Sequence, residues 1–210
     1  MKILDVEQKS FAWHRARAGK LTGTHVEGAL GTLKAQETLR YKLVSELMTE
    51  LQITELNTEA VKRGVEMEPM ARLKVIAETG IDFVETGMLI SDSLPRFGLS
   101  PDGICVENNH VVGGLEIKCP SSAKHLRYCD QGDIPKEYRG QIKAPFLISD
   151  DIQWWLFASY DDRNYSRPLF ILKVSRDNYS ELLGGDIEQD RESLRIFIES
   201  CEALNAKITF

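Results

Sequence analysis

Residues 100–118 contain the feature that most restricts how this chain can fold, a turn sequence followed by an apolar run with charged residues at alternate positions. Ser100-Pro101-Asp102-Gly103 predicts a turn, because Pro presets φ and Gly accepts a positive φ. Asn108-Asn109 predicts a second turn, which folds 111–118 back beside 102–107 as an antiparallel hairpin.

The spacing of the charged residues in this hairpin predicts a metal site. Successive side chains of a strand point to opposite faces, so Glu116 and Lys118 share one face while Ile117 enters the core. Asp102 and Glu116 can then converge on one divalent cation, with Lys118 just beyond it. Hard oxygen ligands of this kind suit Mg2+ or Mn2+. Taken singly, Pro-Asp-Gly is a common turn and Glu-Ile-Lys an ordinary strand with a solvated face; their pairing favours the metal site.

The hydrophobic period changes along the chain and defines the fold class. Helices are predicted over 7–17, from Thr22 or Thr24, over 35–51 (with the stripe Leu39, Leu43, Leu47, Leu51), from Thr58 to Gly80 with an interruption at Pro69, over 121–129, over 136–148, and over 177–206 with a break at Gly184-Gly185. Strands are predicted over 82–90, 96–99, 104–107, 111–118, 152–159 and 169–174. This order indicates an α/β or α+β domain with a mixed sheet covered by helices on both faces.

Length and composition describe an ordinary globular protein. The 210 residues suit one domain, with 42% hydrophobic and 28% charged residues. No apolar stretch is long enough to span a bilayer, and Asp5 falls where a signal peptide needs an apolar core, so we expect a cytoplasmic protein. The four cysteines form no Cys-x-x-Cys pair and the four histidines no cluster, which argues against a zinc enzyme.

The charge distribution bears on the partner. The net charge of −6 does not suggest a bulk nucleic-acid binder. Residues 9–44 nevertheless hold seven Lys or Arg against two acids, whereas 177–202 is acidic. A basic front and an acidic back would suit a protein that holds an anionic polymer on one surface.

Five blocks in order along residues 10–160 give the chain a family resemblance. They are Arg17-Ala18-Gly19-Lys20-Leu21-Thr22-Gly23-Thr24, Gly64-Val65-Glu66-Met67-Glu68-Pro69, Ser100-Pro101-Asp102-Gly103, Leu115-Glu116-Ile117-Lys118-Cys119-Pro120, and Gln141. The sequence thereby resembles the PD-(D/E)XK nuclease superfamily, and within it the phage-lambda-type exonucleases, also called alkaline exonucleases, of phages and prophages.

The resemblance implies a fold, an activity and partners. The fold is a restriction-endonuclease-like α/β domain, 1–210, with a central mixed β-sheet flanked by helices. The activity is a Mg2+-dependent exonuclease that degrades one strand of double-stranded DNA from its 5′ end to mononucleotides, leaving a 3′ single strand for annealing-type recombination. Two Mg2+ ions are expected, with Mn2+ substituting and Ca2+ inhibiting. The implied partners are double-stranded DNA ends, preferably 5′-phosphorylated, two further copies in a homotrimer, and a single-strand annealing protein in the bacterial host cytoplasm.

The same resemblance assigns roles to residues. Asp102, Glu116 and the Ile117 carbonyl would bind metal, joined by a carboxylate from Glu68 or its competitor Glu66. Lys118 would orient the attacking water and stabilise charge on the phosphate, with Gln141 nearby. Apart from the resemblance, bound cations near Lys118 could lower its pKa so that it aids proton transfer, although orientation alone would suffice. A pocket for the terminal 5′-phosphate would be formed by Arg17, Thr24 and Ser100, with Lys124 as a further basic position.

Several of these residues could instead have a purely structural role or none at the site. Glu68 could be an exposed helix acid before Pro69, Arg17 a surface charge, and Gln141 a packing residue. The Trp154-Trp155 pair could stack on bases, although a core or subunit contact fits a strand better. Two functional alternatives also stay open, a structure-specific or restriction-type DNA endonuclease of the same superfamily and a non-catalytic DNA-end-binding module.

Overall fold

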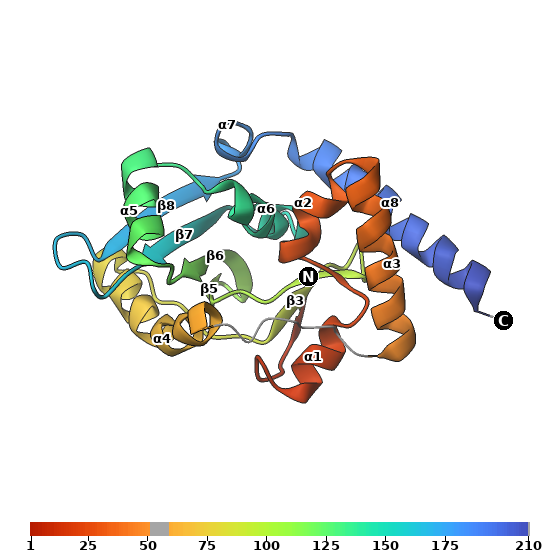
Figure 1. Cartoon of the computed structure of the whole chain (residues 1–210), viewed down its shortest axis with the longest axis horizontal. Helices are drawn as coiled ribbons and strands as arrows, with labels where there is room; N and C mark the ends of the chain where they lie inside the picture. Colours follow the sequence, from red (N-terminus) through yellow and green to blue (C-terminus); the bar gives the residue numbers. More distant parts are fainter. Residues whose placement is uncertain (51–58, 210) are drawn as a thin grey trace.

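The computed structural model describes residues 1–50 and 59–209 (Figure 1). The elements follow in the order β1 (Lys2–Leu4), α1 (Phe11–Arg17), β2 (Leu21–Thr22), η1 (Gly23–His25), α2 (Val26–Ala29), α3 (Leu33–Thr49), α4 (Glu59–Thr79), β3 (Met88–Ile90), β4 (Phe97–Leu99), β5 (Gly103–Glu107), β6 (His110–Lys118), α5 (Ser122–Gln131), η2 (Lys136–Tyr138), α6 (Arg139–Ile148), β7 (Trp154–Tyr160), β8 (Leu169–Ser175), α7 (Tyr179–Leu183) and α8 (Ile187–Ile208). The mixed α/β fold expected from the sequence is confirmed.

Helix α4 differs from its prediction. It runs through Pro69 without interruption, although a proline inside a helix costs about 3 kcal/mol. Ala71 and Val75 on this helix are fully buried against the sheet, and this burial outweighs the local cost. The helix ends at Gly80 (φ +67°) as predicted. Leu51 and Thr58, named in the predictions, lie outside the described residues.

The helical break at Gly184-Gly185 is confirmed, since both glycines have positive φ and separate α7 from α8. The strand predicted over 82–90 is reduced to β3, and Val84 makes only an isolated bridge with Ile104. The sequence analysis also missed β1 and β2, which are too short for their period to be read.

The strands form two mixed sheets. One has the order β1-β3-β4-β2 and the other the order β5-β6-β7-β8. In the second sheet β6 is antiparallel to β5 and parallel to β7, while β7 is antiparallel to β8. The expected single central sheet is therefore divided, and its second half carries the predicted hairpin β5–β6.

Two apolar clusters cover the faces of the β5–β8 sheet. Alternate side chains of β7 divide between them: Trp155 and Phe157 belong to the larger cluster with α6, α7 and α8, whereas Leu156 and Ala158 belong to the smaller one with α4. Glu116 is paired in register with Phe157 across β6 and β7. The charged face of β6 is therefore directed toward α6.

Two glycines allow β6 to approach β7 closely. Gly113 and Gly114 pair in register with Trp154 and Trp155. A Cβ on Gly114 would lie 2.3 Å from the ring of Trp155, which is fully buried. Trp155 thus fills space beside β6 in the core, as expected, and Trp154 is half-buried against the smaller apolar cluster.

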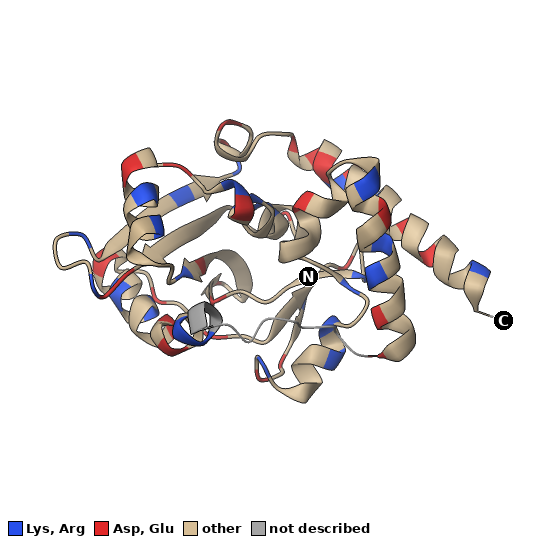
Figure 2. Ribbon diagram, in the orientation of Figure 1, with Lys and Arg blue, Asp and Glu red and all other residues tan. Residues whose placement is uncertain are grey.

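Helix α3, most of which lies in the basic segment 9–44, packs against α8, which carries much of the acidic segment 177–202 (Figure 2). Outside the basic segment, Arg96 forms an ion pair with Glu202 of α8 at 3.1 Å. The expected basic front and acidic back stays a prediction. Among the described helices, none combines the length and apolar character that crossing a membrane requires.

Candidate active site

The hairpin β5–β6 places Asp102 and Glu116 beside each other. Asp102 precedes β5, and its backbone N–H donates to the Leu115 carbonyl at 3.1 Å. Its carboxylate Oδ2 accepts a hydrogen bond from the Ile117 backbone N–H at 2.6 Å. The Ile117 side chain enters the smaller apolar cluster, as the strand period predicted.

Two donors hold one oxygen of the Glu116 carboxylate. Lys118 Nζ lies 2.5 Å and Gln141 Nε2 lies 2.6 Å from Glu116 Oε1. Gln141 comes from the first turn of α6, the helix that covers this face of β6. Lys118 also lies over the ring of Tyr138, with Nζ 5.1 Å from the ring centroid. The predicted group of Asp102, Glu116, Lys118 and Gln141 is therefore brought together.

The electrostatics of this group are those of two carboxylates with one ammonium. Burial and the negative charge of Glu116 raise the pKa of Asp102 well above its ordinary value, although Lys118 opposes the shift. Burial alone would lower the pKa of Lys118, but Glu116 and Asp102 outweigh it and the net pKa is raised. The lowering expected for the Lys118 pKa concerned a site with bound cations, and it stays a prediction. Lys118 is an ammonium here and acts as a donor.

A second cluster of hydrogen-bond donors adjoins these carboxylates. Arg17 ends α1, and its NH1 donates to Ser100 Oγ at 3.0 Å. Trp13 lies one turn earlier on α1, donates from Nε1 to the same Ser100 oxygen at 2.8 Å, and has its ring 4.3 Å from the Arg17 guanidinium carbon. Thr22 Oγ1 connects Arg17 NH2 at 3.5 Å with Thr24 Oγ1 at 3.1 Å.

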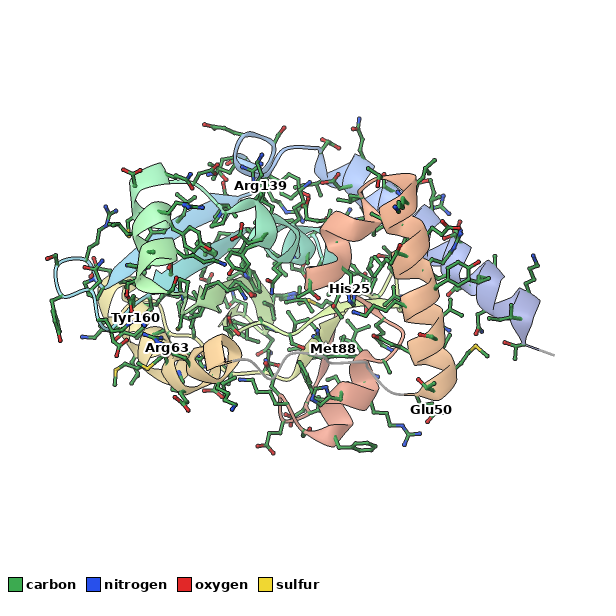
Figure 3. The ribbon with its side chains drawn as sticks, viewed as in Figure 1. His25, Glu50, Arg63, Met88, Arg139 and Tyr160 are labelled. Atoms are coloured by element: carbon green, nitrogen blue, oxygen red, sulfur yellow. The ribbon has the colours of Figure 1, made fainter. Side chains whose placement is uncertain are left out.

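The segment after α1 is held by buried contacts that keep Arg17 and Thr24 in place. Gly19 has φ +65°, and its N–H donates to the fully buried carboxylate of Glu46 at 3.3 Å. His25, labelled in Figure 3, accepts from the Thr22 backbone N–H at 3.3 Å through Nδ1. Burial, with the positive charges of Lys42 and Arg17, lowers the pKa of His25 to about 4, so the ring is neutral at pH 7.

Both clusters open into one cavity of about 180 Å³. Its lining includes the predicted residues Arg17, Thr24, Ser100, Asp102, Glu116, Lys118 and Gln141. Burial lowers the pKa of Arg17 to about 10, opposed by the carboxylates Glu116 and Glu46, so the guanidinium remains charged at neutral pH. The cavity therefore combines two carboxylates and an ammonium with a guanidinium and hydroxyl groups.

Glu68 lies outside this cavity. It lines an adjoining hollow of about 500 Å³, which shares Asp102 with the cavity. Its carboxylate pairs with Lys9 at 3.1 Å and with Arg72 at 3.5 Å. Glu66 is exposed and does not line the hollow, so Glu68 is the acid of this helix that lies beside Asp102.

Lys124 is not part of the cavity. It is exposed on α5 and lines a separate hollow formed with η2. Its position shortly after β6 in the sequence suggested proximity, but the first turn of α5 presents it to another part of the surface. The structure does not gather Lys124 with Arg17, Thr24 and Ser100.

The donor atoms at the hairpin fit a hard divalent cation. Asp102 and Glu116 supply carboxylate oxygens, and their repulsion, expressed in the raised pKa of Asp102, is the condition that a bound cation relieves. Throughout residues 1–50 and 59–209, no three His, Cys, Asp or Glu side chains converge as a ready metal site. Glu68 would have to leave Lys9 and Arg72 to join the other two carboxylates.

The sequence analysis missed two residues that line the cavity. Trp13 fixes both Arg17 and Ser100, and Gln8 donates to the carbonyls of Thr86 and Pro101 at 2.8 Å each. The four-residue spacing of Trp13 and Arg17 on a predicted helix was a readable signal for the first. The contacts of Gln8 are long-range and left no signal in the sequence.

Comparison with known proteins agrees with this geometry. Residues 12–151, more than half of the chain, match the model of the YqaJ-like viral recombinase domain. A search of curated proteins found no match.

Solved structures are similar over almost the whole chain. An alkaline exonuclease (LHK-Exo) from Laribacter hongkongensis is 28% identical with a TM-score of 0.82, and the match covers 95% of this chain and 96% of that one. LHK-Exo in complex with dAMP is 30% identical with a TM-score of 0.76, over 94% of this chain and 97% of that one. A phage related exonuclease from Haemophilus somnus 129PT has 12% identity and a TM-score of 0.63, over 90% and 96%, and shares the fold. The chain therefore belongs to the YqaJ-like viral recombinase family and has the restriction-endonuclease-like fold of the alkaline exonucleases.

Proposed function

We propose that this protein is a Mg2+-dependent exonuclease that degrades one strand of double-stranded DNA from its 5′ end, releases mononucleotides and leaves a 3′ single strand for annealing. One observation carries the proposal: a single cavity is lined both by Asp102, Glu116 and Lys118 and by the donors of Arg17, Ser100 and Thr24. A cavity of about 180 Å³ suits the terminal phosphate and sugar of one strand better than an extended duplex. The complex of the similar LHK-Exo with dAMP, a nucleoside monophosphate, supports the product class.

Asp102, Glu116 and the Ile117 carbonyl would hold Mg2+, or Mn2+ in its place, and Glu68 would add a further carboxylate for a second ion. A bound divalent cation lowers the pKa of a coordinated water and neutralises charge on the phosphate. Ca2+ would support DNA binding without cleavage.

Lys118 is the group of this chain that acts on the reacting atoms. As an ammonium 2.5 Å from Glu116, it can donate to the attacking water and to a phosphate oxygen. Gln141 donates to the same Glu116 oxygen at 2.6 Å, which fixes the carboxylate and thereby the position of Lys118. The water would attack the phosphorus in line, and the departing 3′-oxygen would take up a proton.

Direction along the strand would follow from the donors of Arg17, Ser100 and Thr24. A terminal phosphate has an additional oxygen and a higher charge than a bridging one, so clustered donors favour it. Arg17 and Ser100 are bonded to each other at 3.0 Å, which preorganises them before a phosphate arrives.

The experiment is digestion of three substrates with and without Mg2+: linear duplex with 5′-phosphate, the same duplex with 5′-hydroxyl, and covalently closed circular duplex. We expect rapid release of mononucleotides from the first, slower release from the second, an intact circle, and no reaction without Mg2+. The Lys118→Ala variant controls for contaminating nuclease.

The outcomes separate the alternatives. Nicking of the circle would show an endonuclease of the same superfamily. Binding of duplex ends without Mg2+-dependent loss of any substrate would show a non-catalytic module.

A homotrimer and a single-strand annealing partner, both implied by the resemblance, stay predictions. Sedimentation equilibrium of the purified chain tests the first. Co-purification with an annealing protein expressed from the same phage or prophage tests the second.

A further inference from the structure

A hollow on the surface of α5 and η2 is separate from the active-site cavity. It measures about 460 Å³, and its lining includes Lys124, Arg127, Tyr128, Asp133, Lys136, Glu137 and Arg139. Lys124 and Arg127 are three residues apart on α5 and so lie on one face of the helix. The opposite face of α5 is buried through His125 and Cys129. Figure 2 shows basic residues on α5 and near the start of α6. Figure 3 labels Arg139, the first residue of α6.

The charges of this hollow are unevenly neutralised. Asp133 forms an ion pair with Arg139 at 3.0 Å. Glu137 accepts a hydrogen bond from the Tyr128 hydroxyl at 3.1 Å. Within the described part of the chain, Lys124, Arg127 and Lys136 form no ion pair or side-chain hydrogen bond, and all three are exposed. In a protein of net charge −6, three such cations around one hollow indicate an anionic ligand.

The hollow lies next to the catalytic lysine. Tyr128 packs edge-to-face against Tyr138 with ring centroids 6.2 Å apart, and Lys118 Nζ lies 5.1 Å from the centre of the Tyr138 ring. Two aromatic rings thus separate the hollow from Lys118. A DNA backbone that reaches the cavity can place neighbouring phosphates on the outer side of these rings.

We propose that Lys124, Arg127 and Lys136 form a phosphate-binding surface for the DNA backbone, distinct from the terminal-phosphate donors around Arg17. The ligand is the phosphodiester backbone, supplied by the duplex or by the strand that remains after digestion. This inference rests on the proposed nuclease function for its substrate, but it concerns binding and not hydrolysis.

The test compares two charge-matched double variants in a Lys118→Ala background, which prevents digestion during binding. One variant combines Arg127→Gln with Lys136→Gln. The control combines Lys74→Gln with Lys207→Gln, which removes two exposed cations from α4 and α8. Dissociation constants for a linear duplex and for a single strand of the same sequence are measured between 50 and 300 mM salt, and circular dichroism verifies folding.

We expect the Arg127→Gln/Lys136→Gln variant to bind about tenfold more weakly at 0.1 M salt. The slope of log K against log salt should fall by about two for duplex, or by roughly 1.4 for a single strand. The substrate that occupies the surface is the one whose slope falls by its stated amount relative to the control variant. The preference for a 5′-phosphate over a 5′-hydroxyl end should be unchanged, because a backbone contact does not sense the terminus.

An affinity and slope equal to those of the control variant would overturn the inference, as would a loss confined to 5′-phosphorylated ends. The proposed function fails separately: if the chain with Lys118 intact digests no DNA while the salt slopes behave as expected, the surface stands and the nuclease activity does not.

Discussion

The substitution Arg17→Ala tests how this protein would choose a 5′ end. Arg17 is 8% exposed and is fixed by the Trp13 ring at 4.3 Å and by Ser100 Oγ at 3.0 Å. A guanidinium held in this way binds a phosphate without first losing side-chain entropy. Arg17→Ala removes that donor and leaves the carboxylates and Lys118 in place.

The size of the effect follows from the bonds that are lost. A hydrogen bond to a charged group contributes about 1.5–3 kcal/mol, and 1.4 kcal/mol corresponds to a factor of ten in rate or affinity. Loss of one such bond to the terminal phosphate should slow digestion of 5′-phosphorylated duplex by about 10- to 100-fold. A 5′-hydroxyl duplex offers no terminal phosphate, so its rate should change by about threefold or less.

The assay is single-turnover digestion of the two duplexes, and Arg15→Ala is the matched control. Arg15 lies on the same helix but is mostly exposed and pairs with Glu50 at 2.5 Å, so its removal should alter neither rate. Arg17→Lys keeps the charge without the planar fork and should recover part of the preference. Thermal unfolding of each variant separates lost binding from lost folding, since Arg17 is buried.

Two results would refute the reasoning on end selection. Equal slowing of both duplexes by Arg17→Ala would mean that Arg17 contacts the backbone generally. No slowing of either would mean that the guanidinium has only a structural role beside Trp13, and the pocket would then lie elsewhere in the cavity.

Three further predictions concern the β5–β6 hairpin and Asp102, which precedes it. Asp102→Asn keeps an oxygen for the Ile117 N–H but relieves the repulsion with Glu116, so the melting temperature of the variant in EDTA should rise. The increase in melting temperature that Mg2+ gives the wild type should disappear in the variant. A variant still stabilised by Mg2+ would contradict the metal site. Lys118→Ala should lose about 10²- to 10⁴-fold in rate yet bind Mn2+ by calorimetry, and loss of Mn2+ binding in a folded variant would assign it a structural role. Gly114→Ala should lower the free energy of unfolding by about 1–3 kcal/mol in denaturant titrations, because its Cβ would lie 2.3 Å from the buried Trp155 ring. The control Gly64→Ala, whose Cβ would have nothing within 4 Å, should not destabilise the protein. Equal effects of the two substitutions would contradict the packing account.

Local signals explain what the sequence predicted well. The β5–β6 hairpin follows from turn chemistry, since Asn108 and Asn109 both have positive φ, and from the period of two that separates Glu116 from Ile117. The break between α7 and α8 follows from Gly184-Gly185 for the same reason. In each case the determining interactions lie within a few residues along the chain.

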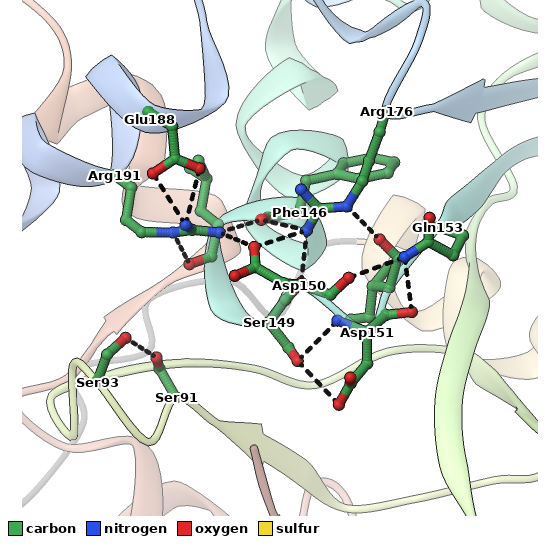
Figure 4. A network of polar contacts seen from close by, with 12 residues as sticks. Ser91, Ser93, Phe146, Ser149, Asp150, Asp151, Gln153, Arg176, Glu188 and Arg191 are labelled. Carbon is green, nitrogen blue, oxygen red and sulfur yellow. Dashed lines mark hydrogen bonds and ion pairs between the residues drawn. The ribbon is translucent and has the colours of Figure 1, made fainter. Parts of the chain in front are cut away.

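Long-range contacts explain what the sequence could not predict. The turn between α6 and β7 is held by Asp150, which accepts from Arg176 at 3.1 Å and from Arg191 at 2.7 Å (Figure 4). The two arginines also donate to carbonyls at the end of α6, including that of Phe146. Because these partners lie more than 25 positions apart in the sequence, no periodic pattern indicates their contacts. The division of the strands into two sheets escaped prediction for the same reason.

The candidate site contains both kinds of residue pair, those placed by local sequence and those placed by long-range packing. Glu116 and Lys118 share a face because they share a strand, so their spacing alone brings them together. Arg17 and Ser100 are 83 positions apart, and only the packing of α1 against the segment after β4 makes them neighbours. Lys124 follows Lys118 closely in the sequence, but the turn into α5 directs it to another surface. Proximity along the chain therefore predicts proximity in space within one strand, and it loses that power at the first turn.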